Sequence, residues 1–588
     1  MQNVMNGPTF SRPGRVPPGA RGLLLALVLG AGLCLAWASP ARAARSNLRY
    51  LDFYRDDERE LVERLSLEEK IGQILIFGFQ GTGLDEDYRR WLAEGRLGNL
   101  KLFLRNVEST EQVRALTDLA CELAARSPAG IPPFIATDLE GGVVNHLRVL
   151  EQAAAPAAGL VGAVGDQAYS AAASRAIALT LHELGINMNF APSVDILTSM
   201  DNQVIGTRSY ASDPGEVYRM AVPFLEEHRK LGILCAVKHF PGHGMTDFDS
   251  HVFSLGVEVS REEMERVHLL PYRELIGRGL VDGCMGNYVI YNNIDPMYPA
   301  TFSAEIMDGL LRGELGFRGV AITDDLEMEG SASYASDMVK AFILAFRGGN
   351  DLILISHTKE HQVRILEAAA HLFRSGALSM EELDERVLRV LRVKKRYLSR
   401  FYVRGGSRAV RERWREQSGD ALARGMDRGI VYLSSRLEEP VPEYLARVSR
   451  EGARGLILAP TVDFARLAER NLPGWDLLYI RYFPDPEQNA ALLAENRGRL
   501  GGYDLVLLGM GTTRQSPWAE ACAAAGVPFI ILSINNPALA MPYASRALFA
   551  ATSFEPYRPA LDALFEAVFE TGVFSRRLPY QQPPVSRP

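Results

Sequence analysis

The chain has 588 residues, which is too long for one ordinary domain and predicts two large domains or one very large one. Its 47% apolar and 23% charged residues are typical of a globular protein rather than a disordered one. A net charge of −7 at pH 7 provides no electrostatic attraction for nucleic acid, so an uncharged or weakly charged substrate fits better.

The N-terminal segment has the pattern of an export signal. Arginines precede the apolar run 23–38, and Ala-Arg-Ala at 41–43 places small residues at the spacing that a signal peptidase recognises. We therefore expect a signal peptide over residues 1–44 and export to the periplasm or the outside of the cell. A retained N-terminal membrane anchor is the alternative. Lipidation at Cys34 is disfavoured, because Leu33 before it is bulkier than that processing tolerates.

Residues 45–402 alternate between short apolar runs and longer helical patterns. Near-continuous apolar strands separated by helices indicate a parallel sheet that is covered on both faces. Eight such strands predict a (β/α)8 TIM-like barrel, and a doubly wound open sheet is the alternative. No G-x-G-x-x-G follows the first strand, which removes the usual dinucleotide signature. The expected strands are 72–79, 100–104, 133–138, 187–192, 233–239, 281–287, 320–325 and 351–356.

A second alternating pattern follows a Gly-rich linker at 403–412. It predicts a smaller α/β layer domain over 413–588, built on an open sheet and without a recognisable catalytic set of residues. Its expected strands are 429–433, 454–460, 503–510, 527–534 and 546–552.

Charged residues stand where several barrel strands are expected to end. A buried strand that ends on a charge must satisfy that charge, and the carboxyl ends of barrel strands meet on one face. Each residue alone could be a helix cap or a surface ion-pair partner, but together they predict a polar pocket. The residues are Asp138 and Glu140 after the third strand, Arg208 after the fourth, Lys238 and His239 at the end of the fifth, and Asp324 and Asp325 at the end of the seventh.

The segment 238–251 holds three of the ten histidines and permits three interpretations. His239, His243 and His251 could bind zinc, but their spacing across a Gly/Pro loop is unlike a tetrahedral site. Histidines could also pin the loop through hydrogen bonds, which we favour for His243. Asp249 lies two residues before His251, so the carboxylate could orient this imidazole for proton transfer.

The motifs in this region resemble those of the family 3 glycoside hydrolases, in the branch of two-domain β-N-acetylglucosaminidases. KHFPGHG at 238–244 is followed after four residues by DSH, which is specific to this branch. DLEGG at 138–142, IGTRSYASDP at 205–214 and LRGELGFRGVAITDDLEM at 311–328 agree with it in order. The C-terminal part resembles the αβα sandwich domain that follows the barrel in such proteins.

The resemblance implies catalytic roles for Asp324, as the nucleophile that forms a covalent glycosyl-enzyme, and for His251, as the acid/base held by Asp249. It also implies that a set of polar residues binds the terminal sugar. The sequence departs from the family pattern at Val143, His146 and Asn287, which bear on sugar-hydroxyl contacts and pocket polarity, and His146 could still reach a sugar hydroxyl. The implied sugar-binding residues are Asp138, Arg208, Lys238 and His239.

The expected function is a retaining β-N-acetylhexosaminidase that removes terminal N-acetylglucosamine from cell-wall muropeptides or chito-oligosaccharides, without a cofactor or metal. The alternatives are a phosphorylase, a β-glucosidase of relaxed specificity, or a non-catalytic wall-glycan binding protein. The expected partner is a carbohydrate, with no nucleic acid and no membrane contact except through an uncleaved N-terminal segment.

Overall fold

The computed structural model describes residues 50–199, 202, 204–246, 256–335, 337–403, 408–575 and 578–580. The predicted signal peptide at 1–44 lies outside these residues. The chain divides into two compact units, Met1–Leu51 and Asp52–Pro588. Across the described ranges, no helix combines the length and apolar character needed to cross a bilayer.

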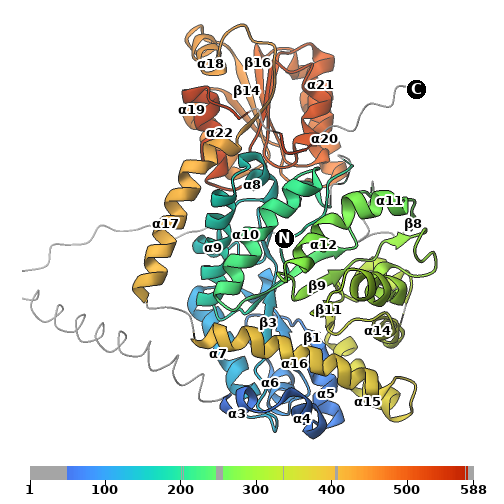
Figure 1. The fold of residues 1–588 in the computed structure, drawn as a ribbon. Helices are drawn as coiled ribbons and strands as arrows, with labels where there is room; N and C mark the ends of the chain where they lie inside the picture. The colour runs from blue at the N-terminus through green and yellow to red at the C-terminus, as the bar shows by residue number, and fades with distance from the viewer. Residues whose placement is uncertain are drawn as a thin grey trace, which may run out of the picture. The chain divides into compact units, whose positions relative to one another are not determined.

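Eight parallel strands form the predicted barrel (Figure 1). The strands are neighbours in chain order, and the first pairs with the last through Ile76 and Leu354. Between the seventh and eighth strands, Ile322 bridges to Leu352 and Leu326 N donates to Leu354 O at 3.0 Å, which brings the sheet to closure. The strands are β1 Leu75–Phe77, β2 Asn99–Lys101, β3 Phe134–Thr137, β6 Met188–Asn189, β7 Leu234–Phe240, β9 Gly283–Gly286, β11 Val320–Ile322 and β12 Ile353–Ile355.

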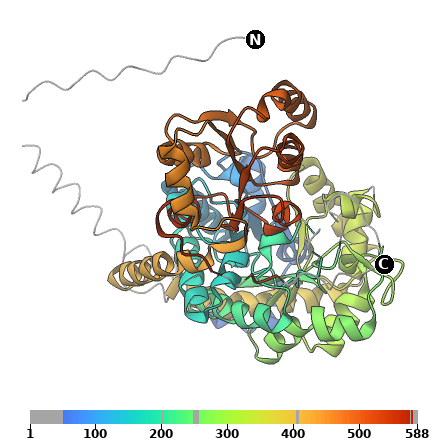
Figure 2. The same cartoon turned by 90° about the horizontal axis from the view of Figure 1, so that it is seen from above.

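Helices cover the outside of this barrel, and their colours run from blue through green to yellow around it in Figure 2. Many of these helices begin at a residue whose side chain caps the first turn. Helix α5, for example, begins with a capping box formed by Ser66 and Glu69. The helices are α3 Leu51–Arg55, α4 Glu58–Arg64, α5 Leu67–Ile74, α6 Glu86–Ala93, α7 Thr110–Ala124, α8 Ala158–Val164, α9 Gln167–Glu183, α10 Pro214–Lys230, α11 Arg261–Glu263, α12 Leu270–Gly277, α13 Glu329–Ala332, α14 Met338–Arg347, α15 Lys359–Arg374 and α16 Met380–Val403.

Helix α16 closes the amino-terminal end of the barrel. Its apolar face joins the interior core, in which Val390, Leu398 and Tyr397 contact the strand residues. Its polar side chains reach two buried carboxylates: Arg389 Nε donates to Asp351 at 2.8 Å, and the Tyr397 hydroxyl donates to Asp282 at 2.8 Å. The barrel is therefore filled and anchored at the end opposite to the predicted pocket.

Two short sheets lie in the loops of the barrel. The antiparallel pair of β4 Leu139–Gly141 and β5 Val144–Asn145 follows β3, and it carries Glu140. The parallel pair of β8 Gly256–Val257 and β10 Ile290–Tyr291 lies further along the chain. Three π-helical segments also occur: η4 Met264–His268 and η6 Glu305–Glu314 in the barrel, and η11 Ala567–Thr571 near the C-terminus.

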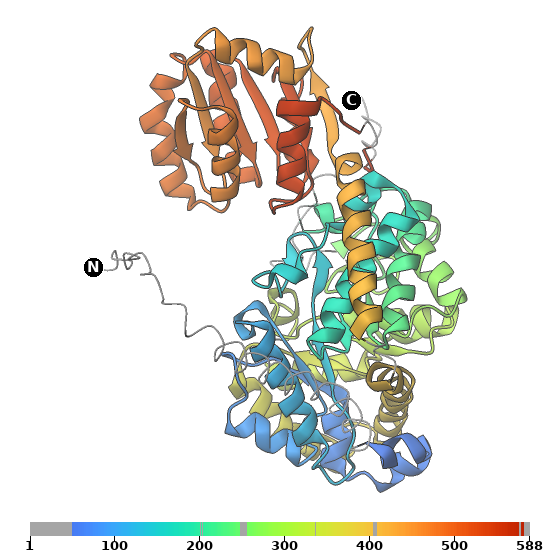
Figure 3. The ribbon, with the colours of Figure 1, turned by 90° about the vertical axis from the view of Figure 1, so that its left-hand side faces the viewer.

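The C-terminal part is a six-stranded sheet with helices on both faces, which confirms the predicted second α/β layer (Figure 3). Its strand order is β13-β18-β17-β16-β14-β15, and only β13 is antiparallel to its neighbour. The edge strand β15 was not among the strands predicted from the sequence. The strands are β13 Val431–Ser435, β14 Gly455–Ala459, β15 Asp476–Tyr479, β16 Leu505–Met510, β17 Phe529–Ser533 and β18 Phe549–Thr552.

The helices of this second layer are α18 Val441–Arg450, α19 Val462–Asn471, α20 Pro486–Leu500, α21 Ser516–Ala525 and α22 Ala560–Glu566. Before it comes α17 Arg408–Met426, which packs along α9 of the barrel rather than on the second sheet (Figure 1). The predicted linker 403–412 thus includes the first turn of α17 and residues 404–407, which are not among those described.

Candidate active site

The carboxyl ends of the barrel strands hold most of the predicted site residues. Asp138 directly follows β3, Lys238 and His239 lie in β7, and Asp324 comes two residues after β11. Because all eight strands run parallel, these ends open on the same face of the barrel. The loops after β3 and β6 add Glu140, Asp195 and Arg208 to that face.

Asp138 is buried between two lysines. Its Oδ1 accepts from Lys238 Nζ at 2.7 Å, and its Oδ2 accepts from Lys101 Nζ. Burial alone would raise the pKa of this carboxyl, but the charges of Lys101 and Lys238 outweigh it and hold the pKa of Asp138 well below its usual value. Asp138 is therefore a permanently ionised acceptor whose lysine partners hold it in place.

His146 lies at the edge of this group, with Nε2 3.5 Å from Asp138 Oδ2. Burial lowers the pKa of His146 to about 4, so the imidazole is neutral at pH 7. Its Nδ1 is buried and has no hydrogen-bond partner among the described residues. A ligand hydroxyl near Nδ1 would satisfy that nitrogen, and the contact of His146 with a sugar stays a prediction.

Glu140 and Arg208 form a two-pronged ion pair. Arg208 Nε and Nη2 donate to Glu140 Oε2 at 2.9 Å and Oε1 at 2.8 Å, and Lys238 Nζ lies 2.6 Å from the same Oε1. Burial would raise the pKa of Glu140, but Arg208 and Lys238 together lower it to about 2. Lys238 thus bridges Asp138 and Glu140, and the two hydrogen bonds to Glu140 fix the plane of the Arg208 guanidinium.

Asp195 organises the histidine side of the site. It is fully buried, and its Oδ2 accepts from His239 Nδ1 at 2.7 Å while its Oδ1 accepts from the His243 amide at 2.6 Å. Arg208 Nη2 lies 3.1 Å from His239 Nε2. Since a guanidinium only donates, this network assigns Nε2 as an acceptor and the proton of His239 to Nδ1. Both ring nitrogens of His239 therefore have protein partners.

His243 has a structural position. It is buried, its Nδ1 contacts the Thr246 hydroxyl at 3.1 Å, and its carbonyl accepts from Asn202 Nδ2 at 2.9 Å. Asn287 is similarly occupied, because its amide donates to the His239 carbonyl at 3.0 Å and to the Tyr291 hydroxyl at 2.8 Å. Both side chains fix the backbone around β7.

The rim cluster is the set Lys101, Asp138, Glu140, Asp195, Arg208, Lys238 and His239. Lys101 and Asp195 were not predicted from the sequence, whereas Glu140 was predicted to lie in the polar pocket but was given no role. Lys101 ends β2, so the rule of charged residues at strand ends could have found it. Asp195 comes after β6 in an irregular loop, and only its full burial identifies it.

The adjacent carboxylates Asp324 and Asp325 have different surroundings. Asp325 is buried, its Oδ2 lies 3.2 Å from His357 Nε2, and its Oδ1 accepts from the Glu327 amide at 3.1 Å. Asp324 is half-buried, and its Oδ1 accepts from the Asp325 amide at 2.8 Å. Its Oδ2 has no hydrogen-bond partner within the described residues. Of the pair, Asp324 has the oxygen available for chemistry.

Ring contacts connect the two sides of the rim. Phe103 is half-buried after β2, and its ring centroid lies 5.0 Å from that of His146 and 5.1 Å from that of His357. Arg105 stacks on the same ring at 4.3 Å and contacts His357 Nδ1 at 3.2 Å. The residues next to Asp138 and those next to Asp324 thus belong to one continuous surface.

The predicted dyad of Asp249 and His251 lies outside the described residues. The same holds for one of the three histidines that the zinc interpretation requires. Within the described ranges, no three His, Cys, Asp or Glu side chains are grouped to hold a metal ion.

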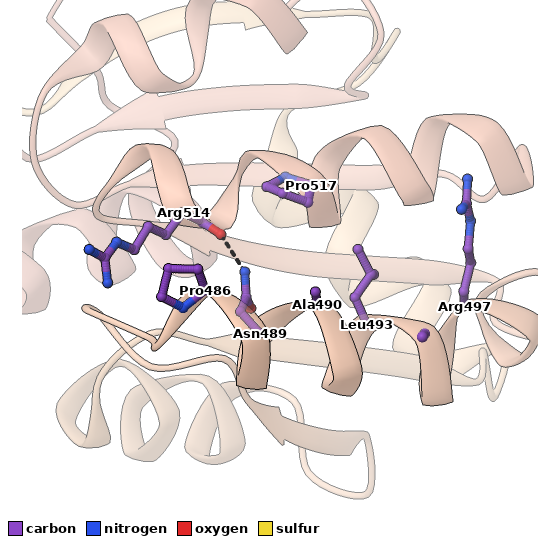
Figure 4. A pocket seen from close by; sticks show the side chains of 8 residues that line it. Pro486, Asn489, Ala490, Leu493, Arg497, Arg514 and Pro517 are labelled. Carbon is purple, nitrogen blue, oxygen red and sulfur yellow. Dashed lines mark hydrogen bonds between the residues drawn. The ribbon is translucent and has the colours of Figure 1, made fainter.

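A separate hollow lies in the second sheet layer, between α20 and α21 (Figure 4). It has a volume of about 320 Å³, and the Asn489 amide on its wall donates to the Arg514 carbonyl at 2.8 Å. None of the predicted site residues that the structure describes lines it. The lining residues are Pro486, Asn489, Ala490, Leu493, Ala494, Arg497, Arg514 and Pro517.

Comparison with known proteins gives a consistent assignment of the barrel. Residues 66–393 match the model of the glycosyl hydrolase family 3 N-terminal domain. The chain is 33% identical over 326 residues to a β-hexosaminidase of Idiomarina loihiensis, in a match that covers 53% of this chain and 95% of that protein. It is 32% identical over 335 residues to β-hexosaminidase A of Pseudoalteromonas piscicida, of which the match covers 56%.

Solved structures extend the likeness to the second sheet. A family 3 β-N-acetylglucosaminidase from Paenibacillus sp. str. FPU-7 superposes with a TM-score of 0.76 at 30% identity, covering 88% of this chain and 99% of that one. A β-glucoside phosphorylase superposes with a TM-score of 0.72 at 20% identity, covering 89% of this chain and 96% of that one. The second likeness concerns the fold alone.

Proposed function

This chain belongs to glycoside hydrolase family 3 and groups with its β-hexosaminidases, and we propose that it is a retaining β-N-acetylhexosaminidase. It removes terminal non-reducing N-acetylglucosamine from cell-wall muropeptides or chito-oligosaccharides, after export from the cytoplasm. The observation that carries the proposal is the rim cluster on the barrel face at which Asp324 also lies, a carboxylate whose Oδ2 has no hydrogen-bond partner among the described residues.

The charge balance of the rim cluster supports an uncharged ligand. Among the described residues, the cations Lys101, Lys238 and Arg208 stand against three carboxylates, Asp138, Glu140 and Asp195. A neutral sugar adds no unpaired charge to this buried set, whereas a carboxylate or phosphate would. Hydroxyl groups both donate and accept, so they can use the remaining lone pairs and N–H groups of such a network.

The reaction proceeds in two displacements at the anomeric carbon. Asp324 Oδ2 attacks that carbon, the glycosidic C–O bond breaks, and the departing oxygen receives a proton from the acid. Water then gives a proton to the same group, now the base, and its oxygen displaces Asp324 to restore the carboxylate. The acid/base is His251 with Asp249 as its partner, as the family motif implies.

The sugar is held by fixed groups while its charge changes. Asp138 and Lys238 are already locked to each other, so they need no rearrangement when the oxocarbenium-like state develops. His146 Nδ1, which has no hydrogen-bond partner in the described part of the chain, can accept from or donate to a hydroxyl. Arg208 and His239 make their strongest contacts to protein, so they shape the pocket as well as line it.

The test is a panel of aryl β-glycosides that differ only at the 2-position: acetamido, hydroxyl and amino. We expect kcat/KM to be highest for the acetamido compound by about 100-fold or more, because a site built for an amide leaves buried polar groups unpaired with the others. Equal rates on the hydroxyl compound would favour a β-glucosidase. A rate that requires phosphate, with a sugar phosphate as product, would establish a phosphorylase instead. Binding without any turnover would leave a wall-glycan binding protein.

A further inference from the structure

The end of the chain packs onto the barrel loop that carries Arg208. Tyr580 is 2% exposed, and its hydroxyl lies 3.2 Å from the Gly206 carbonyl and 2.9 Å from the Ser209 carbonyl. The Ser212 amide donates to the Pro579 carbonyl at 3.1 Å. The described residues 578–580 thus bind this loop through both side chain and backbone.

The position of the Tyr580 ring is defined by close packing. A Cβ atom on Gly159 of α8 would lie 2.3 Å from the Tyr580 hydroxyl oxygen, so no side chain fits there while the ring is in place. The ring of Phe554, which follows β18, lies 6.1 Å from the Tyr580 ring. The barrel and the second sheet layer therefore form the site for Tyr580 together.

The hydroxyl of Tyr580 bridges the two ends of the turn that presents Arg208. That turn is the 3-10 segment η3 Gly206–Arg208, and a hydroxyl has one proton to share between the carbonyls before and after the arginine. The next residue, Ser209, donates its hydroxyl to the Asp195 carbonyl at 2.7 Å. The contact of Tyr580 thus reaches both the Arg208–Glu140 pair and the Asp195–His239 pair.

The second sheet layer contacts the same turn. Thr207 donates its hydroxyl to Asn535 Oδ1 at 3.1 Å, and Asn535 comes two residues after β17. The Cα of Gly206 faces the Asn536 amide, since a Cβ there would lie 3.2 Å from its nitrogen. Gly206 and Thr207, the two residues before Arg208, therefore lie against the C-terminal part of the chain.

We propose that Tyr580 is a positioning residue for Arg208, so that the C-terminal segment sets the sugar affinity of the barrel site. The inference rests on the proposed function for its kinetic consequence. Removing the hydroxyl takes the shared donor from the Ser209 carbonyl and leaves the Gly206 carbonyl with the Ser209 amide alone, which lets the turn relax. Arg208 then loses its fixed plane against Glu140, and substrate binding weakens while the nucleophile is unchanged.

The test uses Tyr580→Phe, which keeps the ring and removes only the hydroxyl. Tyr503→Phe is the matched control, because the Tyr503 hydroxyl donates to Asp476 at 2.7 Å within the second sheet layer. On the aryl N-acetylglucosaminide we expect the KM of Tyr580→Phe to rise about three- to tenfold, with a smaller change in kcat. Tyr503→Phe keeps the KM of the wild type. An unchanged KM in Tyr580→Phe, or an equal rise in the control, overturns the proposal.

A double-mutant cycle separates positioning from general loosening. Tyr580→Phe is combined with Arg208→Lys, which cannot reproduce the two-pronged pair with Glu140. If Tyr580 acts through Arg208, its effect on KM disappears in the Arg208→Lys background. Fully additive effects on KM would contradict the proposal.

Hydrogen exchange gives a readout that does not depend on activity. We expect peptides covering 204–212 to exchange faster in Tyr580→Phe and to be unchanged in Tyr503→Phe. In the wild type, saturation with N-acetylglucosamine should slow exchange both in 204–212 and in the peptide containing 578–580. Lack of turnover by the wild type would reject the proposed function, whereas unaltered exchange of 204–212 in Tyr580→Phe would reject the role of Tyr580.

Discussion

Asp195 is the residue on which the histidine side of the site depends. It is fully buried, and His239, His243 and Ser193 all donate to it. Burial would raise the pKa of Asp195, but these donors outweigh that effect and lower it. A carboxylate can accept from all of them at once, whereas an amide presents an NH2 group to one donor.

We therefore expect Asp195→Asn to lower kcat/KM by about 10- to 100-fold through misplacement of His239 and Arg208. The measurement is steady-state kinetics on the aryl N-acetylglucosaminide, with circular dichroism to confirm the fold. Asp504→Asn is the control, because Asp504 accepts from the Arg454 amide at 2.8 Å in the second sheet layer. Activity of Asp195→Asn within twofold of the wild type would contradict this role.

At the residue scale, position along a strand is enough to group several of the site residues. Asp138, Lys238 and His239 were predicted to share a polar pocket because charges end apolar runs, and the structure joins them in one network. Their contact with a sugar stays a prediction. Asp195 could not be assigned in this way, because its partners come from β7 and are distant in sequence. The different surroundings of Asp324 and Asp325 were also beyond the sequence, since they depend on His357 after β12.

At the scale of elements, the buried carboxylates of Asp351 and Asp282 hold the barrel to its surrounding helices. Asp351, just before β12, is fully buried and accepts from Arg389 Nε at 2.8 Å, from the Ala321 amide at 2.8 Å and from Arg312. These contacts join α16, β11 and η6. They lie at the opposite end of the barrel from the rim cluster.

Asp351→Asn should lower the free energy of unfolding by about 3–5 kcal/mol, because Arg312 and Arg389 lose the charge that compensates their burial. Urea unfolding followed by circular dichroism measures the change. Glu520→Gln is the control: its pair with Arg546 at 3.0 Å is exposed, and its loss should cost less than about 1 kcal/mol. Similar costs for the two variants would show that Asp351 does not hold the barrel together.

The elements were predictable to the extent that burial leaves a signal in the sequence. All eight barrel strands lie within or beside the predicted runs, because parallel strands are apolar on both faces. β15 was missed because Asp476–Tyr479 is a short edge strand with exposed ends and only intermediate burial between them. Helix α17 begins inside the predicted linker, and its packing on α9 depends on tertiary contacts that no local pattern reveals.

At the scale of the whole molecule, Glu555 joins the second sheet layer to the barrel. It is 3% exposed, and its Oε2 accepts from the Ala157 amide at 2.8 Å, at the start of α8. Burial raises the pKa of Glu555 from 4.5 to about 8. The folded state therefore keeps a proton that the unfolded chain releases, so the contribution of Glu555 to stability is greatest below pH 4.5 and is lost as the pH rises toward 8.

Glu555→Gln should remove this pH dependence, because glutamine keeps the acceptor oxygen and cannot ionise. Relative to the wild type, the variant should gain stability between pH 5 and pH 8, on the order of a few kcal/mol. Urea midpoints at the two pH values measure this gain. Glu439→Gln is the control, because the pair of Glu439 with Arg447 at 2.8 Å is partly exposed. Its stability should differ from that of the wild type by the same amount at both pH values. An equal offset for Glu555→Gln at both pH values would mean that Glu555 is ionised in the folded protein.

The central claim is that the barrel carries out glycoside hydrolysis through a covalent bond to Asp324. The most direct measurement is mass spectrometry after reaction with an activated N-acetylglucosaminide that bears fluorine at C5, which slows both displacements. We predict one added sugar per chain, on the peptide that contains Asp324, and none in Asp324→Asn. A label on another residue, or steady turnover of substrate with no trapped sugar, would contradict the account.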